Sequence, residues 1–200
     1  GDSAVVELAR QLEEGKRPTG ISNLWIRHPE TGEIEKNPTA PFNEELDAIP
    51  YVDRTLWEPW IVNPHEEASV LVGRGCPYKC TYCSNHAMEE LAEGSYVRYR
   101  SSEDMIAEID SICDQYPRMK NIYLEIETVG ADVQKGIDLF EKLAEYNNAR
   151  EERLSFRINL ALHSNFVRVE EKYKKFLELC QKANVTALNV GLESGSQRVR

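Results

Sequence analysis

Apolar and polar residues follow two alternating patterns from residue 69 onward. Apolar runs rich in β-branched and aromatic residues, bounded by glycine or polar turns, are typical of strands. Between these runs, apolar residues recur at intervals of three and four, which is typical of helices with one buried face. The expected strands cover 69–75, 121–127, 154–162 and 185–193, and the expected helices cover 101–117, 132–147 and 170–183.

Residues at the helix ends support this division. Ser101 and Asp104 resemble a capping box, although Asp104 stands where Glu or Gln is usual, and Pro117 ends the segment. Asp132 is expected to cap the next helix. The alternating order predicts an α/β fold, with a parallel sheet and helices outside it. Because four strands do not close a barrel, we expect a partial (β/α) barrel.

The predicted strands are unusual because each carries one polar face. Residues two apart share a face of a strand, so a polar set and an apolar set separate cleanly. The polar sets are Tyr123, Glu125 and Glu127; Ser155, Arg157 and Asn159; and Asn189, Gly191 and Glu193. The apolar faces should meet the helices, which leaves the polar faces to line a concave side suited to a polar ligand. The alternative is a sheet whose polar face is merely solvated.

The first third of the chain is less regular. Residues 4–14 predict an amphipathic helix that ends at Gly15, and 23–28 with 33–36 predict two short strands joined by a turn. Residues 37–68 contain five prolines and predict irregular chain. We therefore expect a linker over 1–68, following a further N-terminal domain, and the amino-terminal part of the barrel over 69–200.

Composition restricts the class of protein and its partners. The 200 residues carry a formal net charge of −10, with 41% hydrophobic and 29% charged residues, which fits a soluble protein. An acidic surface disfavours nucleic-acid and anionic-membrane partners, because both require a basic footprint. No apolar run is long enough to span a membrane, and the first residues do not form a signal peptide. We expect a cytoplasmic protein.

The strongest chemical signal is the stretch "GRGCPYKCTYC", residues 73–83, in which Cys76, Cys80 and Cys83 follow a predicted strand directly. Three thiols cannot all form disulfides, and a reducing compartment favours metal binding. One candidate is a zinc site completed by His86. The other is an iron–sulfur cluster with three protein ligands, which would leave one iron open to a substrate.

This stretch resembles the signature of the radical S-adenosylmethionine (SAM) superfamily. "VRYRSSEDMIAEI", "IYLEIET" and "VTALNVGLESGSQRV" resemble successive elements of that family's partial barrel. The resemblance implies that Cys76, Cys80 and Cys83 bind a [4Fe–4S] cluster whose open iron is chelated by SAM. It also implies reductive cleavage of SAM to a 5′-deoxyadenosyl radical. The remaining cysteines, Cys113 and Cys180, fall on apolar helix faces and are expected to act as small hydrophobic residues.

The resemblance implies several contacts with SAM. The backbone around Tyr82 would meet the adenine, unless Tyr82 only packs against the fold. Glu127 matches the acidic position that accepts from the SAM amino group, with Glu125 as a substitute. However, Ile126 stands where the family has Gly or Asp.

Two further residues are implied by the later strands. Glu193 of "GLESG" resembles the acid that accepts from the ribose hydroxyls. Arg157 would neutralise the SAM carboxylate or a substrate acid, or else would form an ion pair with Glu125 or Glu127.

"GLESGS" and the first 68 residues resemble the branch that carries an N-terminal cobalamin-binding domain. The leading hypothesis is therefore a cobalamin-dependent methyltransferase or a related bond-forming enzyme, with cobalamin bound by a domain outside this chain. Its expected partners are a small-molecule, peptide or tetrapyrrole-like substrate and a reductant such as flavodoxin or ferredoxin. The alternatives are a cobalamin-independent enzyme, such as a methylthiotransferase or porphyrinogen oxidase relative, and a zinc-stabilised binding module.

Overall fold

The computed structural model describes residues 1–161, 169–191 and 193–198. The chain divides into two compact units. The first unit contains Gly1–Glu44 and Lys79–Ser95, and the second contains Glu45–Tyr78 and Tyr96–Arg200. One boundary between the units, between Tyr78 and Lys79, therefore falls inside the cysteine stretch.

The second unit is built on a four-stranded parallel sheet with the order β3-β6-β7-β8. Its strands are β3 (Glu67–Leu71), β6 (Asn121–Glu125), β7 (Ser155–Leu160) and β8 (Val185–Val190). All the pairings between them are parallel. The predicted α/β class and the parallel sheet are confirmed.

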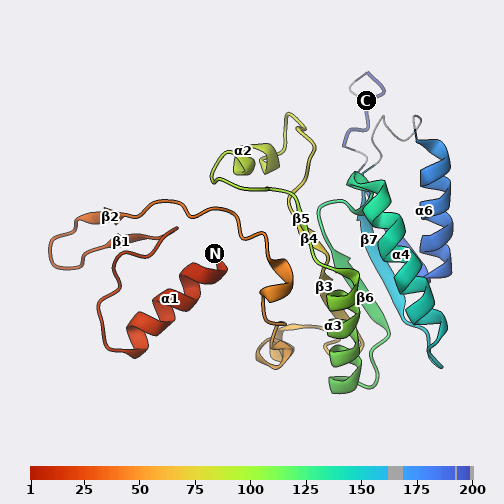
Figure 1. The fold of residues 1–200 in the computed structure, drawn as a ribbon, viewed down its shortest axis with the longest axis horizontal. Helices are drawn as coiled ribbons and strands as arrows, with labels where there is room; N and C mark the ends of the chain where they lie inside the picture. Colours follow the sequence, from red (N-terminus) through yellow and green to blue (C-terminus); the bar gives the residue numbers. More distant parts are fainter. Residues whose placement is uncertain (162–168, 192, 199–200) are drawn as a thin grey trace. The chain divides into compact units, whose positions relative to one another are not determined.

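Helices α3 (Ser102–Gln115), α4 (Val133–Asn148) and α6 (Glu170–Lys182) connect these strands and pack on the sheet (Figure 1). Their starts have the predicted caps. The Ser101 side chain accepts the Asp104 N–H, and the Asp132 carboxylate accepts the N–H groups of Gln134 and Lys135. These caps satisfy amide groups that have no partner inside the helix, each at a gain of about 1 kcal/mol.

The two faces of the sheet differ as predicted. Val70, Leu124 and Ile158 are completely buried under the helices, whereas Arg157 and Glu125, on the opposite face, remain exposed. Tyr123 lies level with Ser69 on one neighbouring strand and with Arg157 on the other, so the polar side chains form rows across the sheet.

Strand β8 departs from the expected burial. Leu188 and Val190, on its predicted apolar face, each keep 43% of their surface exposed. In the described residues β8 pairs only with β7, and α6 packs chiefly on α4. The apolar face of this edge strand is therefore less covered than that of the inner strands.

The first unit contains α1 (Asp2–Glu13), the antiparallel strands β1 (Trp25–Arg27) and β2 (Ile34–Lys36), and α2 (Asn85–Glu89). Helix α1 ends at Glu13, and Gly15, two residues later, has a φ of 68° that allows the chain to turn away near the predicted end. The sequence predicts an apolar side of α1 formed by Val5, Leu8, Ala9 and Leu12, which is wrong in detail. Val5 and Leu12 are exposed, and Ala4 is the buried residue.

Residues 45–60, predicted as irregular, form the 3-10 turns η1 (Leu46–Ala48), η2 (Arg54–Leu56) and η3 (Glu58–Trp60). A further 3-10 turn, η4 (Val129–Ala131), precedes α4. None of the helices in the described ranges has the length and apolar character needed to cross a membrane.

Candidate functional site

The cysteine stretch begins at the carboxyl end of β3, where sheets of this class place their sites. The Val72 N–H donates to the Glu125 carbonyl, which continues the β3–β6 pairing by one residue. The chain then forms β4 (Gly73–Arg74), which pairs antiparallel with β5 (Arg98–Tyr99). Gly73 and Arg74 fall within the strand expected over 69–75, but β5 and its antiparallel pairing with β4 were not predicted, because a strand of two residues has no recognisable periodicity.

Two glycines bring the backbone close to the chain before α3. A Cβ on Gly73 would lie 2.4 Å from the Arg98 carbonyl oxygen, and a Cβ on Gly75 would lie 2.3 Å from the Tyr96 carbonyl oxygen. Gly75 also has a φ of 89°, a conformation that side chains with a Cβ rarely adopt. The backbone immediately before Cys76 therefore requires glycine.

The structure places the three cysteines on both sides of the division between the units. Cys76, in the second unit, is partly buried, whereas Cys80 is exposed and Cys83 partly buried in the first. The Cys83 N–H donates to the Cys80 carbonyl at 3.0 Å, which closes a turn between these two residues. The Asn85 N–H lies 3.5 Å from the Cys83 Sγ. Among the described residues, none of the cysteines forms a disulfide.

The three thiols, and the amide that donates to one of them, are donor groups suited to a thiolate-bound cluster. An amide that donates to sulfur stabilises its negative charge, as is usual around metal-bound cysteines. Within the described ranges, no three His, Cys, Asp or Glu side chains are gathered so as to hold a metal ion. Cysteine ligands commonly come together only as the metal binds, so a metal held by these three thiols would draw the loop together.

His86 lies in α2, shortly after the last cysteine of the motif. Its Nδ1 is buried and has no hydrogen-bond partner among the described residues. A buried ring nitrogen without a partner is costly, so this atom is a plausible ligand in the zinc alternative.

The acidic segment after β6 is tied to the end of β7. The Thr128 hydroxyl accepts the Ala161 N–H at 2.8 Å, and the Asn159 side-chain amide donates to the Ile126 carbonyl at 3.2 Å. These bonds fix the backbone on both sides of Glu127, whose side chain is exposed. The carboxylate that the resemblance assigns to the SAM amino group is therefore accessible on a fixed backbone.

Glu125 and Glu127 are close enough to affect each other. Partial loss of hydration and the nearby Glu127 charge raise the pKa of Glu125 above its usual value. A cationic ligand at this edge would relieve that repulsion, which is consistent with a site for an ammonium group.

The raised Glu125 pKa gives a testable pH dependence. The folded state binds this proton more tightly than the unfolded state, so the resulting stability is present at acidic pH and is lost as pH rises through the folded pKa. We expect Glu125→Gln to stabilise the ligand-free protein at pH 7 by up to about 0.5 kcal/mol, because solvent screens an exposed carboxylate. Urea unfolding at pH 7 and pH 4 measures the difference, which should disappear at pH 4. Glu178→Gln on the exposed side of α6 is the control, and an equal gain at both pH values would contradict the account.

Tyr99 was missed by the sequence reasoning but lies at the centre of this edge. Burial, together with the smaller effect of the charges of Asp132, Cys76 and Glu127, raises its pKa to about 12. The Lys135 amino group lies 4.4 Å above its ring. The first cysteine and the acidic segment therefore lie around the same aromatic ring, a proximity for which the sequence contains no local signal.

Arg157 has a different partner from those expected. Its guanidinium lies 3.7 Å from the carboxylate of Glu67, and no pairing with Glu125 or Glu127 is seen among the described ion pairs. Glu67 is the first residue of β3, so the side chain of Arg157 reaches toward the amino ends of the strands. It lines a hollow of about 270 Å³ together with Ile61, Glu67, Ala68, Ser69, Asn121 and Tyr123.

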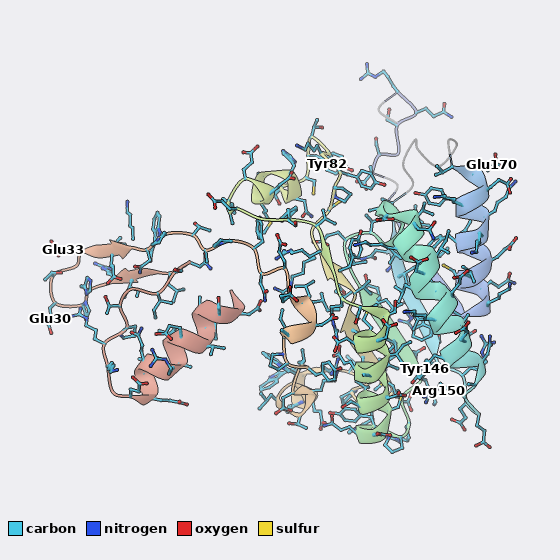
Figure 2. The ribbon with its side chains drawn as sticks, viewed as in Figure 1. Glu30, Glu33, Tyr82, Tyr146, Arg150 and Glu170 are labelled. Carbon is cyan, nitrogen blue, oxygen red and sulfur yellow. The ribbon has the colours of Figure 1, made fainter. Side chains whose placement is uncertain are left out.

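The remaining predicted contacts are Tyr82 and Glu193, which belong to different units. Tyr82 belongs to the first unit and is 68% exposed in the loop before α2 (Figure 2), and both its contact with the adenine and its packing alternative stay predictions. Glu193 follows β8, is exposed and has a φ of 64°. Its role and those of Glu127 and Arg157 stay predictions.

A parallel sheet with helices on one face, and a cysteine loop directly after its first strand, define an α/β protein with a site at the carboxyl edge of the sheet. Residues 70–200 match the radical SAM superfamily, and the chain belongs to this superfamily.

The whole chain is similar in sequence to one methyltransferase and similar in fold to two solved radical SAM enzymes. The chain is 24% identical to the uncharacterized methyltransferase PH0819 of Pyrococcus horikoshii, over 100% of this chain and 40% of that protein. The radical SAM methyltransferase TsrM from Kitasatospora setae, solved with cobalamin and a [4Fe–4S] cluster, has a similar fold. Its TM-score is 0.66 at 16% identity, over 99% of this chain and 38% of TsrM.

The cobalamin-dependent SAM radical enzyme OxsB also has a similar fold. Its TM-score is 0.66 at 20% identity, over 100% of this chain and 28% of OxsB. The chain therefore spans two fifths or less of the length of these relatives.

Proposed function

We propose that this chain forms the cluster-binding part of a radical SAM enzyme. The observation that carries the proposal is the C-x3-C-x2-C motif directly after β3, in a chain whose residues 70–200 match the superfamily. Cys76, Cys80 and Cys83 would bind a [4Fe–4S] cluster and leave one iron for SAM. When bound, the cluster supplies the electron that cleaves SAM to the 5′-deoxyadenosyl radical.

The residues of the chain would hold and orient these groups. Gly73 and Gly75 place the backbone before Cys76, and the amide of Asn85 would stabilise the Cys83 thiolate. Glu127 would accept hydrogen bonds from the SAM ammonium group, since a carboxylate is a strong acceptor for a charged donor. Glu193 would accept from the ribose hydroxyls, and the backbone around Tyr82 would meet the adenine.

We further propose a cobalamin-dependent methyltransferase or a related bond-forming enzyme. The proposal is supported by the similarity to PH0819, a methyltransferase, to TsrM, a radical SAM methyltransferase solved with cobalamin, and to OxsB, a cobalamin-dependent enzyme. The resemblance of residues 1–68 to the linker of the cobalamin-binding branch also supports it. Cobalamin would be bound by a domain outside this chain. A flavodoxin or ferredoxin would supply the electron, and the substrate would be a small molecule or a peptide-like or tetrapyrrole-like compound.

The second candidate is a zinc-stabilised binding module. The buried Nδ1 of His86, without a hydrogen-bond partner, favours it because three thiolates and one imidazole form a common structural zinc site. The two candidates predict different metals, different metal counts and different absorption.

Anaerobic reconstitution with iron and sulfide separates these candidates. We expect about four irons per chain and an absorption band near ~400 nm, because a cubane cluster contains four irons. One tightly bound zinc, with no uptake of iron, would contradict the proposal. Addition of cobalamin to the full-length protein then distinguishes a cobalamin-dependent enzyme, which should retain it through gel filtration, from a methylthiotransferase or porphyrinogen oxidase relative.

A further inference from the structure

A cluster of buried charges lies beside β3, within the second unit. We call Arg54, Arg100, Asp104 and Glu108 the Glu108 cluster. The side chains of Glu108 and Arg100 are only 4% and 5% exposed, and that of Arg54 is 14% exposed. Charged residues are seldom buried to this extent unless each is paired, so the partners of these groups are informative.

Glu108 joins the two arginines. Its carboxylate accepts from Arg54 Nη2 at 2.7 Å and, through its other oxygen, from Arg100 Nη1 at 2.5 Å. Asp104, one helical turn earlier on α3, accepts from Arg100 Nε at 2.8 Å. The Tyr51 hydroxyl donates to the other oxygen of Asp104 at 2.9 Å. Each guanidinium is therefore held from the side of α3.

Both guanidinium groups also reach the backbone of β3. Arg54 Nη2 donates to the Ser69 carbonyl at 2.8 Å, and Arg100 Nη1 donates to the Leu71 carbonyl at 3.0 Å. The backbone N–H of Arg100 donates to the Val72 carbonyl at 2.9 Å. Alternate residues of a strand direct their carbonyls to the same side, and β3 pairs only with β6 in the described sheet. The arginines therefore satisfy the carbonyls on the outer edge of β3.

This edge leads directly into the cysteine stretch. Leu71 and Val72 precede Gly73, which pairs with Tyr99 one residue before Arg100. Arg100 thus donates to Leu71 with its side chain and to Val72 with its backbone. Strand β5, which ends just before Arg100, pairs with the next two residues, Gly73 and Arg74. Cys76 lies five residues after Leu71.

We propose that Glu108 is a positioning residue for the cysteine loop. Acting through Arg54 and Arg100, it fixes the last residues of β3 and, with them, the start of the loop that presents Cys76. The effect of Glu108 on the conformation of the loop does not depend on the proposed function, whereas its effect on the cluster rests on it. The competing explanation is that the Glu108 cluster only attaches α3 to the sheet.

Hydrogen exchange of the full-length, cluster-free protein separates these explanations. Glu108→Gln keeps the size of the side chain but removes the charged acceptor that Arg54 and Arg100 share, so Arg100 keeps only Asp104 and Arg54 keeps no charged acceptor among the described ion pairs. We expect exchange in peptides covering 71–78 and 96–100 to accelerate by at least about tenfold, with exchange in α4 and α6 unchanged. A uniform acceleration throughout the second unit, or no change at the loop, would overturn the positioning role.

Asp110→Asn is the matched control on the same helix. Asp110 accepts from the Tyr146 hydroxyl at 2.7 Å, on the side of α3 that faces α4, and has no contact with β3 in the described bonds. Its loss should leave exchange in 71–78 as in the parent protein. If Glu108→Gln does not fold, Arg54→Lys serves in its place, because it keeps the charge while weakening the bonds to Glu108 and Ser69.

The rate of iron loss to a chelator tests the link to the cluster. After reconstitution, we expect Glu108→Gln to lose iron at least about fivefold faster than the parent and Asp110→Asn, with Glu108→Asp between them. Equal rates in all four proteins would overturn the role toward the cluster. If the parent takes up no iron, the proposed function fails, and the exchange experiment still decides whether Glu108 positions the loop.

Discussion

Replacement of Cys76, Cys80 or Cys83 by alanine is expected to abolish cluster assembly, leaving less than about one iron per chain after anaerobic reconstitution. The full-length variants should form no detectable 5′-deoxyadenosine from SAM. In the proposed cluster each of the three thiolates would bind one iron, and the fourth iron would be left for SAM. No other thiolate of the loop could therefore replace a lost ligand. Iron and sulfide analysis, absorption near ~400 nm and chromatography of the nucleoside products measure these effects.

Cys113→Ala is the matched control for the cysteine variants. Cys113 lies on α3, partly buried against the core, and burial raises the pKa of its thiol. A thiol that resists ionisation is a poor ligand, so this variant should retain the iron content of the parent. SAM cleavage that survived in any of the three loop variants would show that the ligand assignment is wrong.

Replacement of Gly75 by alanine is expected to have the second largest effect. The added Cβ would lie 2.3 Å from the Tyr96 carbonyl oxygen, a backbone atom that cannot move away by a change of rotamer. The φ of 89° adds conformational strain. We expect a loss of about 3 kcal/mol or more in the free energy of unfolding, together with poor cluster assembly. Urea unfolding of the cluster-free protein measures the first effect.

Gly32→Ala separates the effect of the steric overlap from that of the strained backbone conformation. Gly32 lies in the turn between β1 and β2 with a φ of 73°, but an added Cβ there has no atom within 4 Å. Its substitution should therefore report conformational strain alone, at about 1 kcal/mol. An equal loss of stability in both variants would show that the close approach of Gly75 to the Tyr96 carbonyl does not contribute to the effect of Gly75→Ala.

The α/β fold could be predicted from the sequence because its signals are local. The buried side chains of Phe156 and Ile158 alternate with polar residues along β7, and such a two-residue period identifies a strand with one covered face. Ser101 and Asp132 marked the starts of α3 and α4 because a short polar side chain satisfies the first free amides of a helix. Each of these features depends on residues close together in the chain.

Features that depend on distant residues could not be predicted in this way. Arg54 and Glu108 are 54 residues apart, and their pairing follows only once α3 packs beside β3. The pairing of Arg157 with Glu67 also depends on the register of the sheet, and the sequence analysis had considered only Glu125 and Glu127 as ion-pair partners.

The site shows the same division between local and distant signals. The spacing of Cys76, Cys80 and Cys83 within eight residues is a local pattern, and it identified the candidate ligands. Tyr99 reaches the same edge through the two-residue pairing of β4 with β5, for which no local pattern exists. The cofactor contact proposed for Glu193 has no signal within this chain beyond the resemblance of "GLESG" to the family.

The central claim is tested most directly by SAM cleavage in the full-length protein, reconstituted anaerobically and reduced with dithionite. The account predicts formation of 5′-deoxyadenosine that requires both the cluster and the reductant, whereas the 200-residue chain alone should cleave SAM weakly or not at all. A full-length protein that carries a complete cluster but leaves SAM intact under these conditions would contradict the account.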